Sequence, residues 1–80
     1  MHARPAARNI EEDLRELDET ARSIERLGAR IQAQERRIAA LRRDGIETGS
    51  AEEIRARLCD SLKDMVMHRA LILHAMTFGN

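Results

Sequence analysis

Residues 10–43 read IEEDLRELDETARSIERLGARIQAQERRIAALRR, and large aliphatic side chains return in this stretch every seven residues. The members of this row are Ile10, Leu17, Ile24, Ile31 and Ile38. A second, patchier row beside it comprises Leu14, Ala21, Leu27 and Leu41. This spacing follows one face of a helix, so it predicts a long helix that packs lengthwise against other helices, as in a coiled coil.

Capping and turn residues set the ends of the predicted helices. Asn9 suits an N-cap, and Asp44-Gly45 suits a helix end at which Gly45 adopts the left-handed conformation of a Schellman motif. Ser50 and Glu53 have the spacing of a capping box, which predicts the start of a second helix. The expected elements are a helix over about 9–44, a turn over about 45–50 and a helix over about 51–77.

The second predicted helix has its own apolar stripe. The stripe consists of Ala51, Ile54, Leu58, Leu62, Met65, Ile72 and Met76. Because the connection is short, the two helices are expected to lie side by side and antiparallel, with Leu41 near Ile54 and Leu17 near Met76. The predicted fold is therefore all-α, a two-helix antiparallel hairpin in one domain over 9–80, preceded by a flexible N-terminal arm over 1–8.

Composition describes one small domain. The chain has 80 residues, a net charge of zero, one Phe, no Trp or Tyr, and one cysteine. A lone Cys59 forms no internal disulfide, and the first eight residues lack the apolar segment of a secretory signal. The longest apolar stretch, residues 70–73, is too short to cross a bilayer. These features predict a cytoplasmic protein without a membrane segment.

The end of the second helix has more apolar surface than a hairpin needs. Val66, Met67, Leu71 and Leu73 point away from the apolar stripe, so we expect neighbours on more than one side of this helix. The predicted oligomer or partner interface comprises Met65, Val66, Met67, Leu71, Leu73, Met76 and Phe78. The simplest assembly is a homodimer forming a four-helix bundle. Coverage of this surface within a monomer by Phe78 and by Lys and Arg stems is the alternative.

Charge is segmented along the chain. Residues 22–43 hold seven Arg against Glu25 and Glu35, and residues 44–64 hold six acids against three basic residues. A possible anion or nucleic-acid face comprises Arg22, Arg26, Arg30, Arg36, Arg37 and Arg43. The alternative function that this face suggests is RNA binding by a helical dimer, analogous in architecture to the plasmid copy-number regulator Rop. The zero net charge and the lack of exposed aromatic side chains argue against this function.

No residue pattern predicts an enzyme. The acids at the start of the first helix suit capping, and no pair of carboxylates faces a predicted cleft. His68 and His74 lie six residues apart, about 240° around a helix, and do not chelate one metal from a single chain. Cys59 is expected to be a small buried hydrophobe. Gly28 either permits close approach of a neighbouring helix or marks a weak point. We expect no catalytic residue, cofactor or metal.

Several segments resemble a group of small, largely uncharacterised helical-hairpin proteins of α-proteobacteria. The resemblance rests on IQAQERRI at 31–38, on LRRDGIET at 41–48, and on Ala51, Ser61-Leu62 and His68-Arg69. It covers roughly residues 28–69 and implies a bacterial cytoplasmic hairpin, without any known activity. Together with the excess apolar surface, these observations predict a non-enzymatic small regulatory or adaptor protein that acts through helix-mediated protein-protein interaction.

Overall fold

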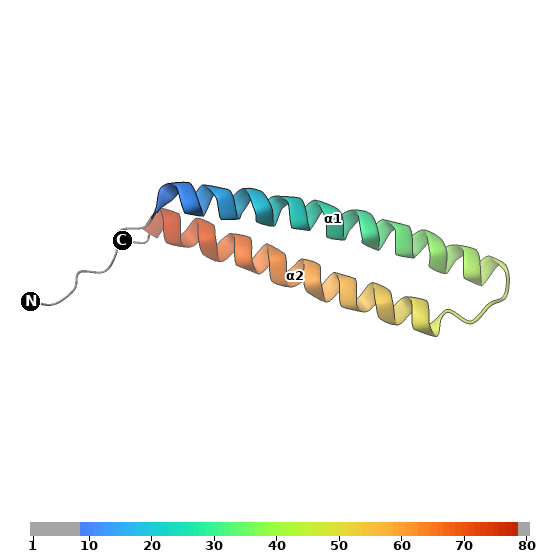
Figure 1. The fold of residues 1–80 in the computed structure, drawn as a ribbon. Helices are drawn as coiled ribbons and strands as arrows, with labels where there is room; N and C mark the ends of the chain where they lie inside the picture. Colours follow the sequence, from blue (N-terminus) through green and yellow to red (C-terminus); the bar gives the residue numbers. More distant parts are fainter. Residues whose placement is uncertain (1–8, 79–80) are drawn as a thin grey trace, which may run out of the picture.

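The computed structural model describes residues 9–78 as two antiparallel helices joined by a five-residue connection (Figure 1). Helix α1 spans Ile10–Arg43 and helix α2 spans Gly49–Phe78, and the described residues contain no strand. The predicted all-α hairpin is confirmed. We call the end at which α1 begins and α2 finishes the open end, and the opposite end the loop end. The arm predicted for residues 1–8 lies outside the described residues.

Both ends of α1 form as their sequence predicts. The Asn9 side chain accepts a hydrogen bond from the Glu12 N–H at 3.1 Å, which caps the helix start. At the other end, Gly45 has a φ of 69°, a conformation that glycine adopts without a steric penalty. The N–H groups of Gly45 and Ile46 then donate to the carbonyls of Arg42 and Leu41 at 3.0 and 2.8 Å, the bonding pattern of a Schellman motif.

Helix α2 begins at Gly49, two residues before the predicted start, and the predicted capping box of Ser50 and Glu53 does not form. Thr48 instead makes the hydrogen bonds at the start of α2. Its carbonyl accepts the Glu52 N–H at 2.8 Å, and its hydroxyl donates to the Glu52 carboxylate at 2.9 Å. Ser50 is therefore already inside the first turn. Two pairs of a hydroxyl residue and a glutamate, Thr48 with Glu52 and Ser50 with Glu53, have a spacing that suits a helix start. The path of the connection selects the earlier pair.

The first apolar row of α1 faces α2 as predicted, except at its first member. Ile31 and Ile38 are 9% and 5% exposed, and Leu17 and Ile24 are half-buried, whereas Ile10 is exposed. The same side of α2 buries Ala51, Leu58 and Ile72. Ile54, predicted to be part of the apolar stripe, is 45% exposed. The buried residues of the two helices, and not Ile54, form the core of the hairpin.

The second predicted row on α1 is wrong at Leu14 and Ala21 but correct at Leu27 and Leu41, which are half-buried. Leu14 is 54% exposed and Ala21 is also exposed. The row that lies toward α2 is Asp13, Thr20, Leu27, Gln34 and Leu41, so polar side chains take three of its five positions. Asp13 and Thr20 are buried, and the Thr20 hydroxyl donates to the Glu16 carbonyl at 2.7 Å. A polar group whose hydrogen bonds are made is tolerated in such a position, which hydrophobicity alone does not reveal.

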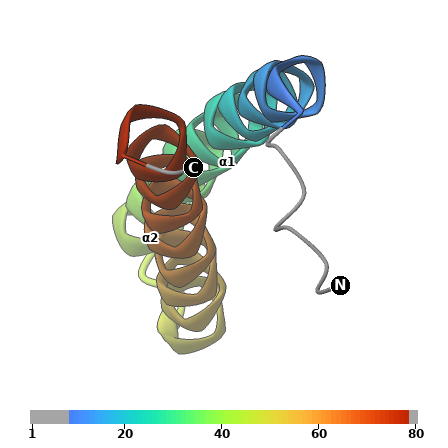
Figure 2. The same ribbon diagram turned by 90° about the vertical axis from the view of Figure 1, so that its left-hand side faces the viewer.

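The register of the two helices also differs from the prediction. The predicted pairing of Leu17 with Met76 would put Glu16 near Thr77 in the last turn of α2, but Glu16 contacts His68 at 2.9 Å. The Gln34 amide likewise donates to the Ala51 carbonyl at 2.9 Å, so α2 starts beside the penultimate turns of α1 rather than level with its end. Figure 2 shows in addition that the helices cross at an angle. A slip of about one heptad keeps the same faces together because the apolar pattern repeats every seven residues.

Candidate interaction surfaces

One side of the hairpin carries a third row of residues on each helix, next to the core. On α1 the row is Leu14, Ala21, Gly28, Glu35 and Arg42, and on α2 it is Glu52, Cys59, Val66 and Leu73. Arg42 and Glu52 pair directly at 2.8 Å, which places both rows on the same side of the molecule. Near the open end the rows are apolar, and near the loop end they are charged. We call the apolar part, Leu14, Ala21, Gly28, Cys59, Val66 and Leu73, the apolar flank.

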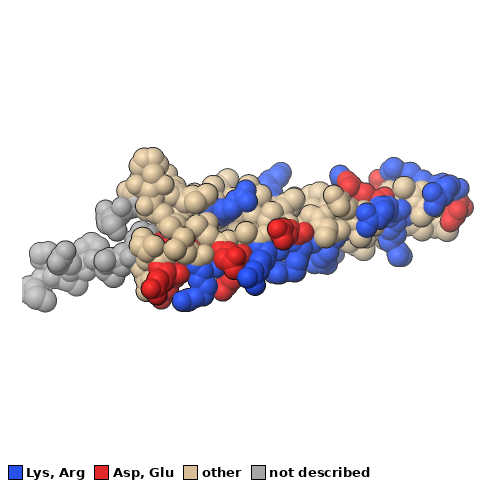
Figure 3. Space-filling view, turned by 90° about the horizontal axis from the view of Figure 1, so that it is seen from above, with Lys and Arg blue, Asp and Glu red and all other residues tan. Residues whose placement is uncertain are grey.

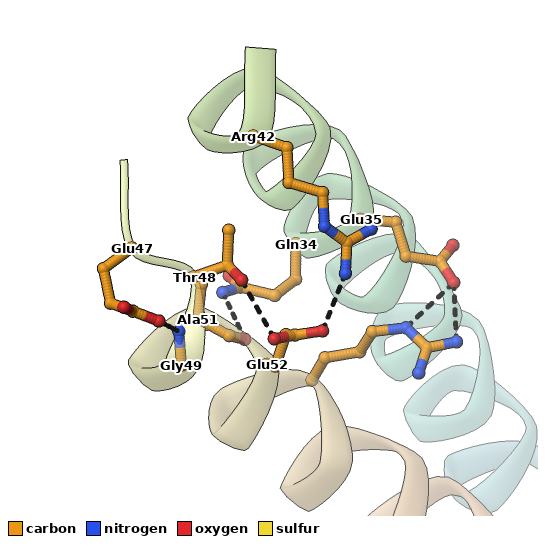
Figure 4. A network of polar contacts seen from close by, with 9 residues as sticks. Gln34, Glu35, Arg42, Glu47, Thr48, Gly49, Ala51 and Glu52 are labelled. Carbon is orange, nitrogen blue, oxygen red and sulfur yellow. Dashed lines mark hydrogen bonds and ion pairs between the residues drawn. The ribbon is translucent and has the colours of Figure 1, made fainter. Parts of the chain in front are cut away.

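The loop end of this side is a network of charged and polar groups (Figure 4). Glu52 accepts from Arg42 through one carboxylate oxygen and from Thr48 through the other. Arg55 donates two hydrogen bonds to Glu35, at 3.0 and 2.9 Å, and these bonds raise the pKa of the Arg55 guanidinium. Each pair is about half exposed, so its contribution to stability is small. The network instead favours one register and marks where the apolar surface stops.

We call the opposite side of the hairpin the polar side, because polar contacts join or flank the helices there, although Ile54 on this side is 45% exposed. His68 and Glu16 form a contact between the helices there, and Arg26 donates to the Ser23 hydroxyl at 3.0 Å. An open groove of about 410 Å³ lies between the two helices on this side. It is lined by Ser23, Arg26, Leu27, Arg30, Ser61, Asp64 and Met65. The two sides of the hairpin therefore differ in chemistry, although the same heptads generate both.

The residues predicted as an interface divide into three groups. Met65 and Met76 are half-buried toward α1 and belong to the hairpin itself. Val66 and Leu73, 40% and 47% exposed, belong to the apolar flank. Three more exposed residues form an outer strip on the far side of α2: Met67, Leu71 and Phe78. The Phe78 ring lies 4.9 Å from the His74 ring on this strip.

The predicted arginine face lies on α1 and is exposed. Arg22 pairs with Asp18 on the same helix at 3.1 Å, and Arg26 bonds to Ser23. Within residues 9–78, no ion pair joins any of the other four members, which are Arg30, Arg36, Arg37 and Arg43. Figure 3 shows basic side chains along the middle and at the loop end of one face, with acidic side chains among them, whereas the open end has an uncharged area beside a group of acidic and basic side chains.

Two residues whose roles the sequence left open lie on the apolar flank. A Cβ added at Gly28 would meet no atom within 4 Å, so this glycine does not serve close packing of α2 on α1. Cys59 is a free, half-buried thiol. Among the described residues, no cluster of three or more His, Cys, Asp or Glu side chains is arranged to hold a metal ion. Neither helix, over its described length, has a segment long and apolar enough for a bilayer crossing.

Comparisons with models of known protein families, with characterised proteins and with solved structures give no match to this chain. The resemblance to the bacterial hairpin proteins therefore stays a prediction. The surfaces themselves carry the functional argument.

Proposed function

We propose that this chain is a non-enzymatic small regulatory or adaptor protein of the bacterial cytoplasm, which self-associates and binds another protein through helix surfaces. One observation carries the proposal, namely the apolar surface at the open end. Leu14, Val66, Met67, Leu71, Leu73 and Phe78 are each at least 40% exposed there. Contiguous apolar patches on soluble proteins commonly mark protein-binding surfaces. Self-association would bury the apolar flank, and the outer strip would then serve a second protein.

The thin core supports self-association. Among the residues that the structure describes, five apolar residues are buried, and no side chain has less than 2% of its area exposed. A chain of this size gains little stability from such a core alone, and packing with further helices is a common remedy. A dimer of hairpins would give each helix two neighbours, which suits helices with apolar residues in three heptad rows.

The double substitution Leu71→Glu and Leu73→Glu is expected to abolish self-association. A carboxylate at position 73 would lie in the desolvated apolar interface and cost several kcal/mol, and a second one at position 71 adds charge to the same end of α2, so a dimer in the micromolar range should become monomeric up to about 100 µM. The measurement is the solution mass of the purified protein over a concentration series, by light scattering or sedimentation. The original chain should approach twice its monomer mass of 9.1 kDa.

The matched control is Gln32→Glu with Ala33→Glu, which adds the same charge at exposed positions of α1 away from the apolar surface. This control should dimerise as the original chain does. A monomer of the original chain at every concentration would refute self-association, as would equal loss of the dimer in both double variants.

RNA binding is the second candidate function, because five of the six arginines on the predicted face have no ion pair within the described residues. Phosphate contacts would make such binding steeply dependent on salt. The test is an electrophoretic shift of structured RNA at low salt, with Arg26→Gln, Arg30→Gln and Arg37→Gln combined as the comparison. Absence of any shift at low salt would reject this function.

A further inference from the structure

We propose that a second copy of this chain docks on the apolar flank in the antiparallel sense, with the two loop ends pointing in opposite directions. This inference rests on the self-association proposed above and assigns its face and orientation. The twofold axis would pass between the two copies at the level of Ala21 and Val66. Helix α1 would face α1 of the second copy, and α2 would face α2.

The flank consists of three layers that grow in size toward the open end. The contacts Glu16–His68 and Glu35–Arg55 lie on either side of Ala21 and Val66 along the hairpin and place these two residues at about the same level. Seven residues to each side, Gly28 is then about level with Cys59, and Leu14 with Leu73. The layers are thus small at Gly28 and Cys59, intermediate at Ala21 and Val66, and large at Leu14 and Leu73.

This gradient favours the antiparallel orientation. A twofold axis through the middle layer puts the large layer of each copy against the small layer of the other, so all three layers of the interface contain similar volumes. Protein cores reach their packing density by such alternation of large and small side chains. In a parallel dimer, by contrast, two large layers would meet at the open end and two small layers near the loop, which forces the helices apart at one end.

The free space at Gly28 has a direct use in this arrangement. Nothing in its own chain lies within 4 Å of the position that a Cβ would occupy, and the facing residue in the second copy is Leu14, which is 54% exposed in the single hairpin. The glycine would give that leucine room to approach the backbone of α1. The cost of a glycine inside a helix, about 1 kcal/mol relative to alanine, then has a structural reason.

Charge at the loop end also opposes the parallel orientation. There, Glu35 of one copy would face Glu52 of the other, because Glu35 follows Gly28 by seven residues and Glu52 precedes Cys59 by seven, so both lie one heptad closer to the loop than the small layer. Like charges in facing positions are unfavourable. In the antiparallel dimer, Glu35, Arg42 and Glu52 lie beyond the helix ends of the second copy, so no acid of the network faces another and the half-exposed ion pairs stay hydrated.

The native thiol makes the orientation measurable in the full-length protein. In the antiparallel dimer, Cys59 of one copy faces Leu73 of the other, so Leu73→Cys is expected to form an intermolecular disulfide with Cys59 under mild oxidation. The two native Cys59 thiols would lie fourteen residues apart along the bundle, about 21 Å, and would not join. A parallel dimer would instead place Cys59 against Gly28, and Gly28→Cys would form the disulfide.

Ser61→Cys on the polar side is the matched control, and all three variants keep Cys59. We expect covalent dimer from Leu73→Cys at least about tenfold faster than from the control, because facing thiols have effective concentrations in the millimolar range. Peptide masses after digestion identify which positions are joined. Faster linkage through Gly28→Cys, or equal rates in all three variants, would overturn the antiparallel assignment while leaving self-association intact.

Single substitutions separate this inference from the broader function. Leu73→Glu on the apolar flank should raise the dimer dissociation constant at least about a hundredfold, and Leu71→Glu on the outer strip should change it less than about threefold, since a charge is costly only where it is desolvated. The opposite ranking would overturn the assigned face. A chain that is monomeric throughout would overturn both this inference and the self-association on which it rests.

Discussion

Ile38→Ala is expected to lower the free energy of unfolding by about 3 kcal/mol. Ile38 is 5% exposed and is the most completely buried aliphatic residue of α1. Truncation of a large buried aliphatic side chain loses its transfer free energy and leaves a cavity, at a combined cost of about 2–5 kcal/mol. In a domain with so few buried side chains, this is a large fraction of a total stability of about 5 kcal/mol. The difference in free energy of unfolding is measured by urea denaturation monitored by circular dichroism.

Ile54→Ala is the matched control for this measurement. Ile54 is 45% exposed on α2, so the same truncation should cost less than about 1 kcal/mol. Both variants must be compared at one protein concentration, because self-association would add concentration-dependent stability. Equal losses in the two variants would contradict the burial that distinguishes these isoleucines.

Ala51→Leu is expected to destabilise the hairpin by about 2 kcal/mol despite adding apolar volume. Ala51 is 6% exposed, and its carbonyl accepts the hydrogen bond from Gln34 at 2.9 Å. The small side chain lets the first turn of α2 approach α1 closely enough for that bond. A leucine would force the helices apart, and overpacking of this kind costs about 1–3 kcal/mol. Thermal or urea unfolding measures the loss.

The same substitution at an exposed alanine of α2, Ala56→Leu, provides the comparison. Its effect should stay within about 0.5 kcal/mol, because the added side chain meets only solvent. Stabilisation by Ala51→Leu would mean that the two helices are not in close contact at the loop end, and the assigned register would then be wrong.

Local signals in the sequence predicted the elements well. Asn9 and Gly45 cap α1 as expected, because each works through its own side chain or backbone conformation and needs nothing distant. The seven-residue row from Leu17 to Ile38 was placed correctly toward α2, since its members share one helix face whatever the partner. The start of α2 was missed by two residues because both Thr48 and Ser50 precede a glutamate at a spacing that suits a helix start.

Surface assignments were harder to predict. Leu14 and Ala21 were expected in the core because they are apolar and adjacent to the main row. The exposure of Leu14 turns that apparent core row into a candidate interface. On α2, the exposure of Val66, Met67, Leu71 and Leu73 agrees with the prediction that they point outward, but their division between a flank and an outer strip required the position of α1.

The sequence by itself determined two helices, their caps and the tight turn, together with the side of α1 that carries its isoleucines. Only the tertiary structure decided which neighbouring row completes the core, how far α2 slides along α1, and therefore which apolar residues remain exposed. The physical reason is the heptad repeat. A shift of seven residues presents nearly the same faces, so the choice falls to specific contacts such as Gln34 with Ala51 and Glu16 with His68.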